Sequence, residues 1–102
     1  MSVKQRVDSA LQQGNVVVFT FSNCPNCIAT KKTLSDSEVQ FHDVVLDKWD
    51  PSDKEAALDY LETLSGARTV PRVFIGGKCI GGNHEFQQQF VKGGRLNELR
   101  GA

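Results

Sequence analysis

Hydrophobic positions change their spacing several times along this chain, and each change predicts a new element. Apolar residues recur at helical spacing behind a Ser2–Gln5 capping-box pattern, and this pattern ends at Gly14-Asn15. The segment Val16–Phe21 is β-branched and aromatic with little polar alternation, which is typical of a strand covered on both faces. The chain therefore opens with a predicted helix and a predicted central strand.

The middle of the chain predicts a helix, a strand and a further helix. Pro25 suits the first position of a helix that runs past Leu34, and Val39–Leu46 is interpreted as a second strand. Asp50 suits the N-cap of the next helix, and Gly66 is well placed to end it. Its apolar stripe consists of Ala57, Leu58, Leu61 and Leu64.

The last third begins with two short strands, Arg72–Ile75 and Lys78–Ile80, joined at Gly76-Gly77 as a β-hairpin. Asn83 is predicted to cap the helix that follows. That helix carries Phe86, Phe90 and Val91 on one side, and after Gly93-Gly94 a short helix with Leu96 and Leu99 closes the chain.

Two strand–helix–strand passages followed by a hairpin predict an α/β fold with a four-stranded mixed sheet flanked by helices on both faces. The length of 102 residues suits one domain, which we expect to span residues 1–102.

Charge and hydrophobicity argue against two classes of protein, nucleic-acid-binding proteins and membrane-spanning proteins. Twelve basic and twelve acidic residues give a net charge of zero, which argues against a nucleic-acid partner. The longest apolar run, Val16–Phe19, is too short to span a membrane. The N-terminus lacks the apolar core of a secretory signal, so we expect a reducing, cytoplasmic compartment. Separately, we expect the protein to be a monomer.

Two of the three cysteines form the sequence Cys24-Pro25-Asn26-Cys27, which in a reducing compartment indicates redox chemistry or metal binding. Cys24 lies at the predicted start of a helix, where unpaired backbone N–H groups favour a negatively charged sulfur. Cys27 lies about one turn later and should be the more buried thiol. We therefore expect Cys24 to attack a disulfide and Cys27 to resolve the mixed disulfide.

The alternative is half of a structural zinc site, which would need further ligands nearby. The remaining candidates are Cys79 and His84, more than fifty residues downstream, together with His42, so we favour redox chemistry and expect no metal. Cys79, on the second hairpin strand, is interpreted as a buried thiol that acts as a small hydrophobic residue.

The strand–CPxC–helix arrangement, with Thr69-Val70-Pro71 and Gly81-Gly82 downstream, resembles the dithiol glutaredoxins over most of the chain. The resemblance implies a thioredoxin fold and glutathione-dependent reduction of protein disulfides and glutathione mixed disulfides. It also implies a cis peptide bond before Pro71, through which the Val70 backbone could pair with the cysteine residue of the substrate. The implied partners are glutathione and proteins that carry disulfides or bound glutathione.

The same resemblance implies a glutathione site on two segments. The γ-glutamyl end would lie at the start of the helix near Gly82, held by backbone N–H groups and by Glu85, where many family members have Asp. The implied glutathione-binding residues are Arg68, Thr69, Val70, Pro71, Gly82, Asn83, His84 and Glu85.

Several residues around the cysteines depart from the family pattern. Phe21 stands where many glutaredoxins have Lys or Arg, and Thr63 lies at or near a common Gln; both family residues help to bind the glycine carboxylate of glutathione. Asn26 replaces the usual Tyr. These differences from the family pattern favour the hypothesis that the natural thiol is a glutathione derivative with a blocked glycine carboxylate, such as trypanothione.

A second function class is a binding role, in which Cys24 and glutathione would hold an iron–sulfur cluster between two chains. Glutaredoxins that do this usually lack Pro after the first cysteine, so Pro25 argues against it.

Overall fold

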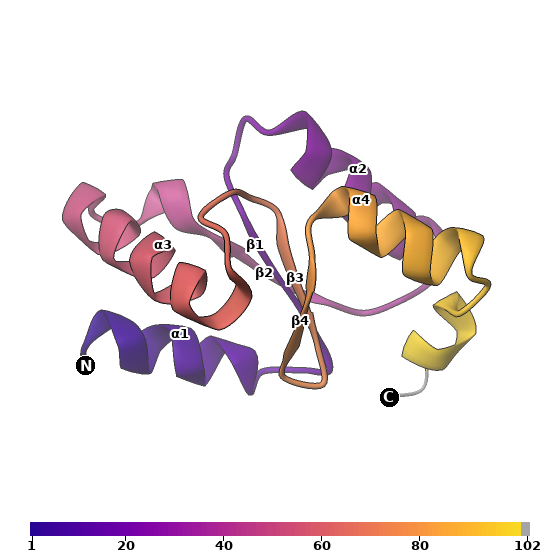
Figure 1. Ribbon diagram of the computed structural model, residues 1–102, viewed down its shortest axis with the longest axis horizontal. Helices are drawn as coiled ribbons and strands as arrows, with labels where there is room; N and C mark the ends of the chain where they lie inside the picture. The colour runs from indigo at the N-terminus through magenta and orange to yellow at the C-terminus, as the bar shows by residue number, and fades with distance from the viewer. Residues whose placement is uncertain (101–102) are drawn as a thin grey trace.

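Strand β1 (Val16–Thr20) lies in the interior of the sheet, and all five of its residues are buried. The computed structural model describes residues 1–100 and orders the sheet β2-β1-β3-β4 (Figure 1). β2 (His42–Val45) runs parallel to β1, whereas β3 (Arg72–Ile75) pairs antiparallel with both β1 and β4 (Lys78–Gly81). The predicted central strand and the four-stranded mixed sheet are confirmed.

Helices cover the sheet on both faces (Figure 1). On one face lie α1 (Val3–Leu11) and α3 (Pro51–Ser65), and on the other lie α2 (Pro25–Asp36) and α4 (Asn83–Phe86). α4 continues as a π-helical segment, Gln87–Lys92, and is followed by a 3-10 helix at Leu96–Leu99.

Two hydrophobic clusters fill the space between the sheet and these helices. The first joins α1 and α3 to the sheet and contains Val7, Ala10, Val17, Phe19, Val44, Leu46, Ala57, Leu58, Leu61 and Phe74. The second joins α2, α4 and the C-terminal 3-10 helix to the opposite face and contains Val16, Val18, Leu34, Val39, Val73, Phe86, Phe90 and Leu99. Because β1 contributes alternate residues to each cluster, its burial on both faces follows from its central place.

Most predicted helix boundaries are confirmed by their caps. Ser2 and Gln5 form the reciprocal capping box of α1, and the Asp50 carboxylate accepts the Ser52 N–H at the start of α3. Gly66 ends α3 with a φ of 83°, a left-handed conformation that glycine adopts without the strain of a side chain.

The strands end earlier or later than the sequence pattern predicts. β1 stops at Thr20, so Phe21 lies in the turn beyond it, while β4 extends one residue further, to Gly81. These differences are of the size at which strand ends generally vary.

The second strand begins at His42 rather than Val39. The backbone N–H of Val39 donates to the carbonyl oxygen of Leu34 at 2.9 Å, and Glu38 has a φ of 61°, so these residues close helix α2. Val39 is buried by packing on that helix end, which a sequence pattern cannot distinguish from burial in a sheet. At the other end, Leu46–Lys48 forms a 3-10 helix, labelled η1 here, instead of more strand.

Three further expectations about the helices are corrected. Leu64 and Val91 are 42% and 37% exposed, so each lies at the edge of its helix's apolar face rather than within it. The N-cap of α4 is Gly82, not Asn83, which is already helical. Phe86 and Phe90 are buried, as predicted, and their rings are stacked on each other.

No helix within residues 1–100 is long and apolar enough to cross a membrane.

Candidate active site

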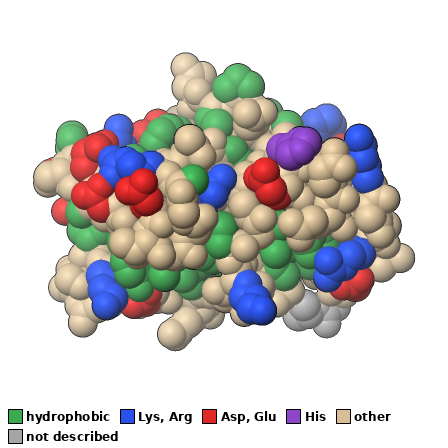
Figure 2. Space-filling view, viewed as in Figure 1, with side chains coloured by type: hydrophobic (Ala, Val, Ile, Leu, Met, Phe, Trp, Pro, Cys, Tyr) green, Lys and Arg blue, Asp and Glu red, His purple; other side chains and the backbone are tan. Residues whose placement is uncertain are grey.

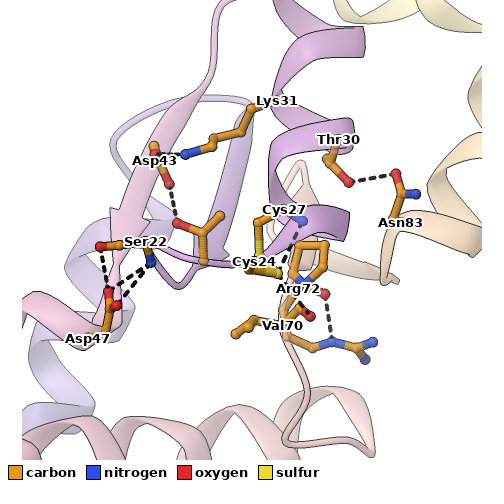
Figure 3. The surroundings of a disulfide bond; sticks show 12 residues. Ser22, Cys24, Cys27, Thr30, Lys31, Asp43, Asp47, Val70, Arg72 and Asn83 are labelled. Carbon is orange, nitrogen blue, oxygen red and sulfur yellow. Dashed lines mark hydrogen bonds and ion pairs between the residues drawn. A yellow bond between two sulfur atoms is a disulfide. The ribbon is translucent and has the colours of Figure 1, made fainter.

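Cys24 lies where the turn after β1 enters helix α2 (Figure 3). It is the N-cap residue, with extended backbone angles, and its Sγ accepts a hydrogen bond from the backbone N–H of Cys27 at 3.2 Å. Pro25 occupies the first turn of the helix, where its missing N–H costs no hydrogen bond. The sulfur of Cys24 is therefore placed at the positive end of α2, where a negative charge is stabilised.

Cys24 and Cys27 form a disulfide, with their Cα atoms 5.2 Å apart. The two residues differ in access: Cys27 is fully buried, whereas Cys24 is half-buried and Pro25 and Asn26 beside it are exposed. The predicted burial of Cys27 is confirmed. A disulfide approaching from solvent reaches Cys24 first.

A second segment reaches the cysteines from β3. The Cys24 Sγ lies 3.9 Å from the carbonyl oxygen of Val70, and the peptide bond between Val70 and Pro71 is cis, as expected. β1 and β3 are antiparallel, with Phe19 opposite Arg72, so the start of β3 lies beside the end of β1. Sheet topology thus brings Cys24 and Val70 together.

The third segment is the start of α4. The backbone N–H of Gly82 donates to the Glu85 carboxylate at 2.7 Å, and this hydrogen bond is the main reason why the pKa of Glu85 lies below its ordinary value. His84 and Arg72 add a smaller electrostatic effect in the same direction. Arg72 is buried, and its Nε donates to the carbonyl oxygen of Pro71 at 3.2 Å. Glu85 is therefore held as an exposed, ionised carboxylate at this helix start.

The Asn83 side chain contacts α2 and does not cap its own helix, contrary to the prediction from the sequence. Its side-chain oxygen accepts a hydrogen bond from the buried hydroxyl of Thr30 at 2.7 Å (Figure 3). The same oxygen accepts a second hydrogen bond from the amide of Gln87 at 3.1 Å. The Asn83 side chain therefore joins α4 to α2.

Arg68, one of the implied glutathione-binding residues, is already paired with acidic side chains. Its guanidinium donates to Glu55 at 2.8 Å and also to Asp59, both on α3. Figure 2 shows acidic side chains gathered around basic ones over this helix. A substrate carboxylate would have to compete with these two acidic groups. Thr69, beside Arg68, is exposed.

Lys54 is a residue near the site that sequence reasoning missed. Its ammonium nitrogen lies 5.3 Å from the centre of the Phe21 ring, a cation–π distance, and its nearest carboxylate is Glu55 at 3.9 Å. Lys54 and Phe21 are far apart along the chain, and no sequence motif joins them. Phe21 stands where many glutaredoxins have Lys or Arg, and the ammonium group of Lys54 supplies a positive charge beside that position.

Asp47 is the second missed residue. Its carboxylate accepts the backbone N–H and the hydroxyl of Ser22, each at 3.0 Å, in the turn that leads to Cys24. The hydrogen bond from the Ser22 N–H is the largest cause of the lowered pKa of Asp47, and Lys54 contributes electrostatically. The turn is therefore tied to the 3-10 helix η1.

Polar side chains also join α2 to the sheet, where Lys31 of α2 reaches Asp43 of β2 (Figure 3). The buried Thr20 hydroxyl donates to Asp43 at 2.7 Å, and Lys31 donates to the other Asp43 oxygen at 2.9 Å.

The sequence predicts that Cys79 is buried, but the structure shows it half-buried, packed against the hydrophobic cluster that contains Phe74. Within residues 1–100, the structure brings no three His, Cys, Asp or Glu side chains to a place where they could share a metal ion.

Comparison with known proteins decides the family. The family model described as Glutaredoxin matches residues 16–80, which include both cysteines of the pair, the cis-proline segment and the β3–β4 hairpin except for its last residue, Gly81. The chain belongs to the glutaredoxin family. It is accordingly a glutathione-dependent thiol–disulfide oxidoreductase with a redox-active cysteine pair.

Relatives and solved structures agree with this assignment over nearly the whole chain. Glutaredoxin-1 of Sus scrofa is 42% identical over 97 residues, covering 92% of this chain and 90% of that protein. The crystal structure of a buckwheat glutaredoxin–glutathione complex matches with a TM-score of 0.86 at 31% identity, covering 95% of this chain and 86% of that one. Glutaredoxin C1 from Populus tremula x tremuloides, in its holo form, gives the same TM-score at 30% identity, covering 96% of this chain and 95% of that one. The thioredoxin fold expected from the sequence is confirmed.

Proposed function

We propose that Cys24 is the attacking thiol of this glutaredoxin and that Cys27 is the resolving thiol. The observation that carries the proposal is the difference between the two sulfurs: Cys24 is half-buried at a helix N-terminus and accepts the Cys27 N–H, whereas Cys27 is fully buried. A thiolate needs both access and stabilisation of its negative charge, and Cys24 has both.

In the first step, the Cys24 thiolate attacks the glutathione sulfur of a glutathionylated protein. The protein leaves as a thiolate, takes up a proton, and Cys24 holds a mixed disulfide with glutathione. A second glutathione thiolate can then attack the bound glutathione sulfur, which gives oxidised glutathione and free Cys24. Alternatively, Cys27 loses its proton and attacks the Cys24 sulfur, which releases reduced glutathione and forms the Cys24–Cys27 disulfide seen here.

The test compares Cys24→Ser with Cys27→Ser on a glutathionylated peptide. Cys24→Ser should abolish turnover, because no thiol remains at the position that solvent can reach. Cys27→Ser should retain much of it, because the glutathione route does not use Cys27. Full activity of Cys24→Ser would contradict the proposal, and Cys79→Ser is the matched control because its thiol lies outside the pair.

We further propose that bound glutathione lies along the edge formed by the cis-proline segment and the start of α4. The Val70 backbone would pair with its cysteine residue, and Gly82 with Glu85 would receive its γ-glutamyl end. Thr69 and Pro71 belong to the cis-proline segment that would contact glutathione. Asn83 would position the start of α4 through its hydrogen bond with Thr30. His84 is exposed at the start of α4, where it would border the γ-glutamyl end.

Two candidate co-substrates, glutathione and a derivative such as trypanothione, differ in whether the glycine carboxylate is free or blocked. The ion pairs of Arg68 and the absence of charge at Phe21 favour a derivative with a blocked carboxylate, such as trypanothione, whereas the ammonium of Lys54 near Phe21 favours glutathione itself. Turnover with glutathione and with its glycine amide, in the natural chain and in Lys54→Met, distinguishes them. If glutathione is preferred and Lys54→Met removes that preference, the derivative is excluded.

We place the protein in a reducing compartment such as the cytoplasm and propose that it works as a monomer, since turnover as written needs reduced glutathione and a single chain. Size-exclusion chromatography of the reduced and oxidised forms tests the monomer.

A further inference from the structure

Asp47 holds the turn between β1 and α2 from outside that turn. The backbone N–H of Ser22 donates to both carboxylate oxygens of Asp47 at 3.0 Å, and the Ser22 hydroxyl donates to one of them, also at 3.0 Å (Figure 3). Ser22 lies two residues before Cys24. Movement of the turn therefore breaks several hydrogen bonds at once.

The pairing of the two parallel strands explains why these groups meet. Thr20 and Val45 are the last residues of β1 and β2 and lie opposite each other in the register of these strands. Ser22 and Asp47 each lie two residues beyond these strand ends, in the turn before α2 and in η1. Leu46, the neighbour of Asp47, is fully buried, so the carboxylate is mounted on a fixed element.

We propose that Asp47 is a positioning residue for the reactive sulfur. By fixing Ser22, it fixes the backbone that enters the N-cap of α2 and keeps the Cys24 Sγ within 3.2 Å of the Cys27 N–H. That N–H stabilises the thiolate only while the sulfur stays in line with it. The turn and the helix start then act as one preorganised unit.

A purely electrostatic role for Asp47 predicts the opposite result. A negative charge near Cys24 would disfavour the thiolate, although Lys54, whose ammonium lies beside the Phe21 ring in the same turn, partly offsets it. Removing the charge would therefore make the thiolate easier to form, whereas removing the hydrogen bonds would make it harder. The sign of the change separates the two roles.

The experiment measures the midpoint pH of thiolate formation at Cys24 in the reduced full-length chain carrying Cys27→Ser, which keeps the backbone N–H at position 27. Rates of alkylation by iodoacetamide are followed against pH and assigned to Cys24 by mass spectrometry, so Cys79 does not contribute. We expect Asp47→Ala to raise the midpoint by about half a pH unit, which is about a threefold loss of thiolate below the midpoint. Asp47→Asn, which keeps an acceptor oxygen but no charge, should restore most of it.

The chain contains a matched control. Asp50 accepts the N–H and the hydroxyl of Ser52 at 3.1 and 3.0 Å, the same pattern that joins Asp47 to Ser22, but at the start of α3. Asp50→Ala should lower the thermal unfolding temperature and leave the midpoint at Cys24 unchanged.

Three results would overturn the proposal: a lower midpoint in Asp47→Ala, no change in that variant, or equal values for Asp47→Ala and Asp47→Asn. The inference rests on the proposed function in treating Cys24 as the attacking thiol. The titration does not require turnover, however, so failure of the Cys24 assignment and failure of the Asp47 assignment are distinguished.

Discussion

Glu85 shows how a single hydrogen bond can fix the charge of a side chain at the site. The Gly82 N–H lowers the pKa of Glu85, so the folded chain keeps this carboxylate ionised at pH values where an ordinary carboxylate takes up a proton. The resulting stabilisation of the folded state is complete above the ordinary value of 4.5 and is lost as the pH falls through the lower pKa of the folded chain.

Substitution of Glu85 by Gln tests this effect. The natural chain should be more stable than Glu85→Gln at pH 7, and the difference should shrink as the pH is lowered below about 4.5, because the natural carboxylate is then protonated as well. Urea unfolding at a series of pH values measures it. Glu62→Gln, at an exposed carboxylate on α3, is the control, and a constant gap between natural chain and Glu85→Gln at all pH values would contradict the assignment.

At this scale, the sequence predicts residues whose role depends on near neighbours in the chain. Cys24, Pro25 and Cys27 are positioned by one turn of helix, so their spacing alone predicts their geometry. Asp47 and Lys54 act on Ser22 and Phe21 across the sheet and from α3, and no local pattern records such contacts.

Among the elements, the position of α4 depends on polar contacts with α2. The Asn83 oxygen accepts from Thr30 of α2 and from Gln87, which also donates to the Thr33 hydroxyl at 3.2 Å. Since Cys24 is the N-cap of α2 and Gly82 is the N-cap of α4, these bonds determine how the two parts of the proposed glutathione site lie relative to each other. The sequence predicts Asn83 as the N-cap of α4 because Asn is common at N-cap positions. In the structure, the Asn83 side chain instead accepts a hydrogen bond from Thr30 of α2.

Loss of this contact has a measurable cost. Asn83→Ala leaves the buried Thr30 hydroxyl without the acceptor it has here and leaves the Gln87 amide only the Thr33 hydroxyl. We expect it to lower the free energy of unfolding by about 1–3 kcal/mol in urea titrations. It should also raise the KM for glutathione more than it lowers kcat, because the start of α4 is displaced while Cys24 is not. Gln88→Ala, at an exposed position on the π-helical segment that continues α4, should change the free energy of unfolding by less than about 0.5 kcal/mol. Equal stabilities of the two variants would contradict the role given to Asn83.

For the whole molecule, the order of elements predicts the architecture because the apolar face of each strand or helix must be buried against another element. A strand apolar on both faces needs helices on both sides, and β1 receives α1 with α3 on one side and α2 with α4 on the other (Figure 1). Strand ends are less predictable, since Val39 is buried by a helix end and not by a sheet neighbour. The fold therefore follows from the sequence more fully than the contacts between its elements do.

The β3–β4 turn lies at the end of the sheet opposite the cysteine pair. Gly76 and Gly77 form it with φ values of 59° and 83°, and the Gly76 N–H donates to the Asn15 carbonyl just before β1, whereas Cys24 lies beyond the far end of that strand. A peptide inserted at this turn, with residues that accept positive φ at its ends, would serve as a handle for attachment to a solid support. Molecules attached in this way would all present their thiols outward, so the fold supplies an orientation for a redox-sensing surface.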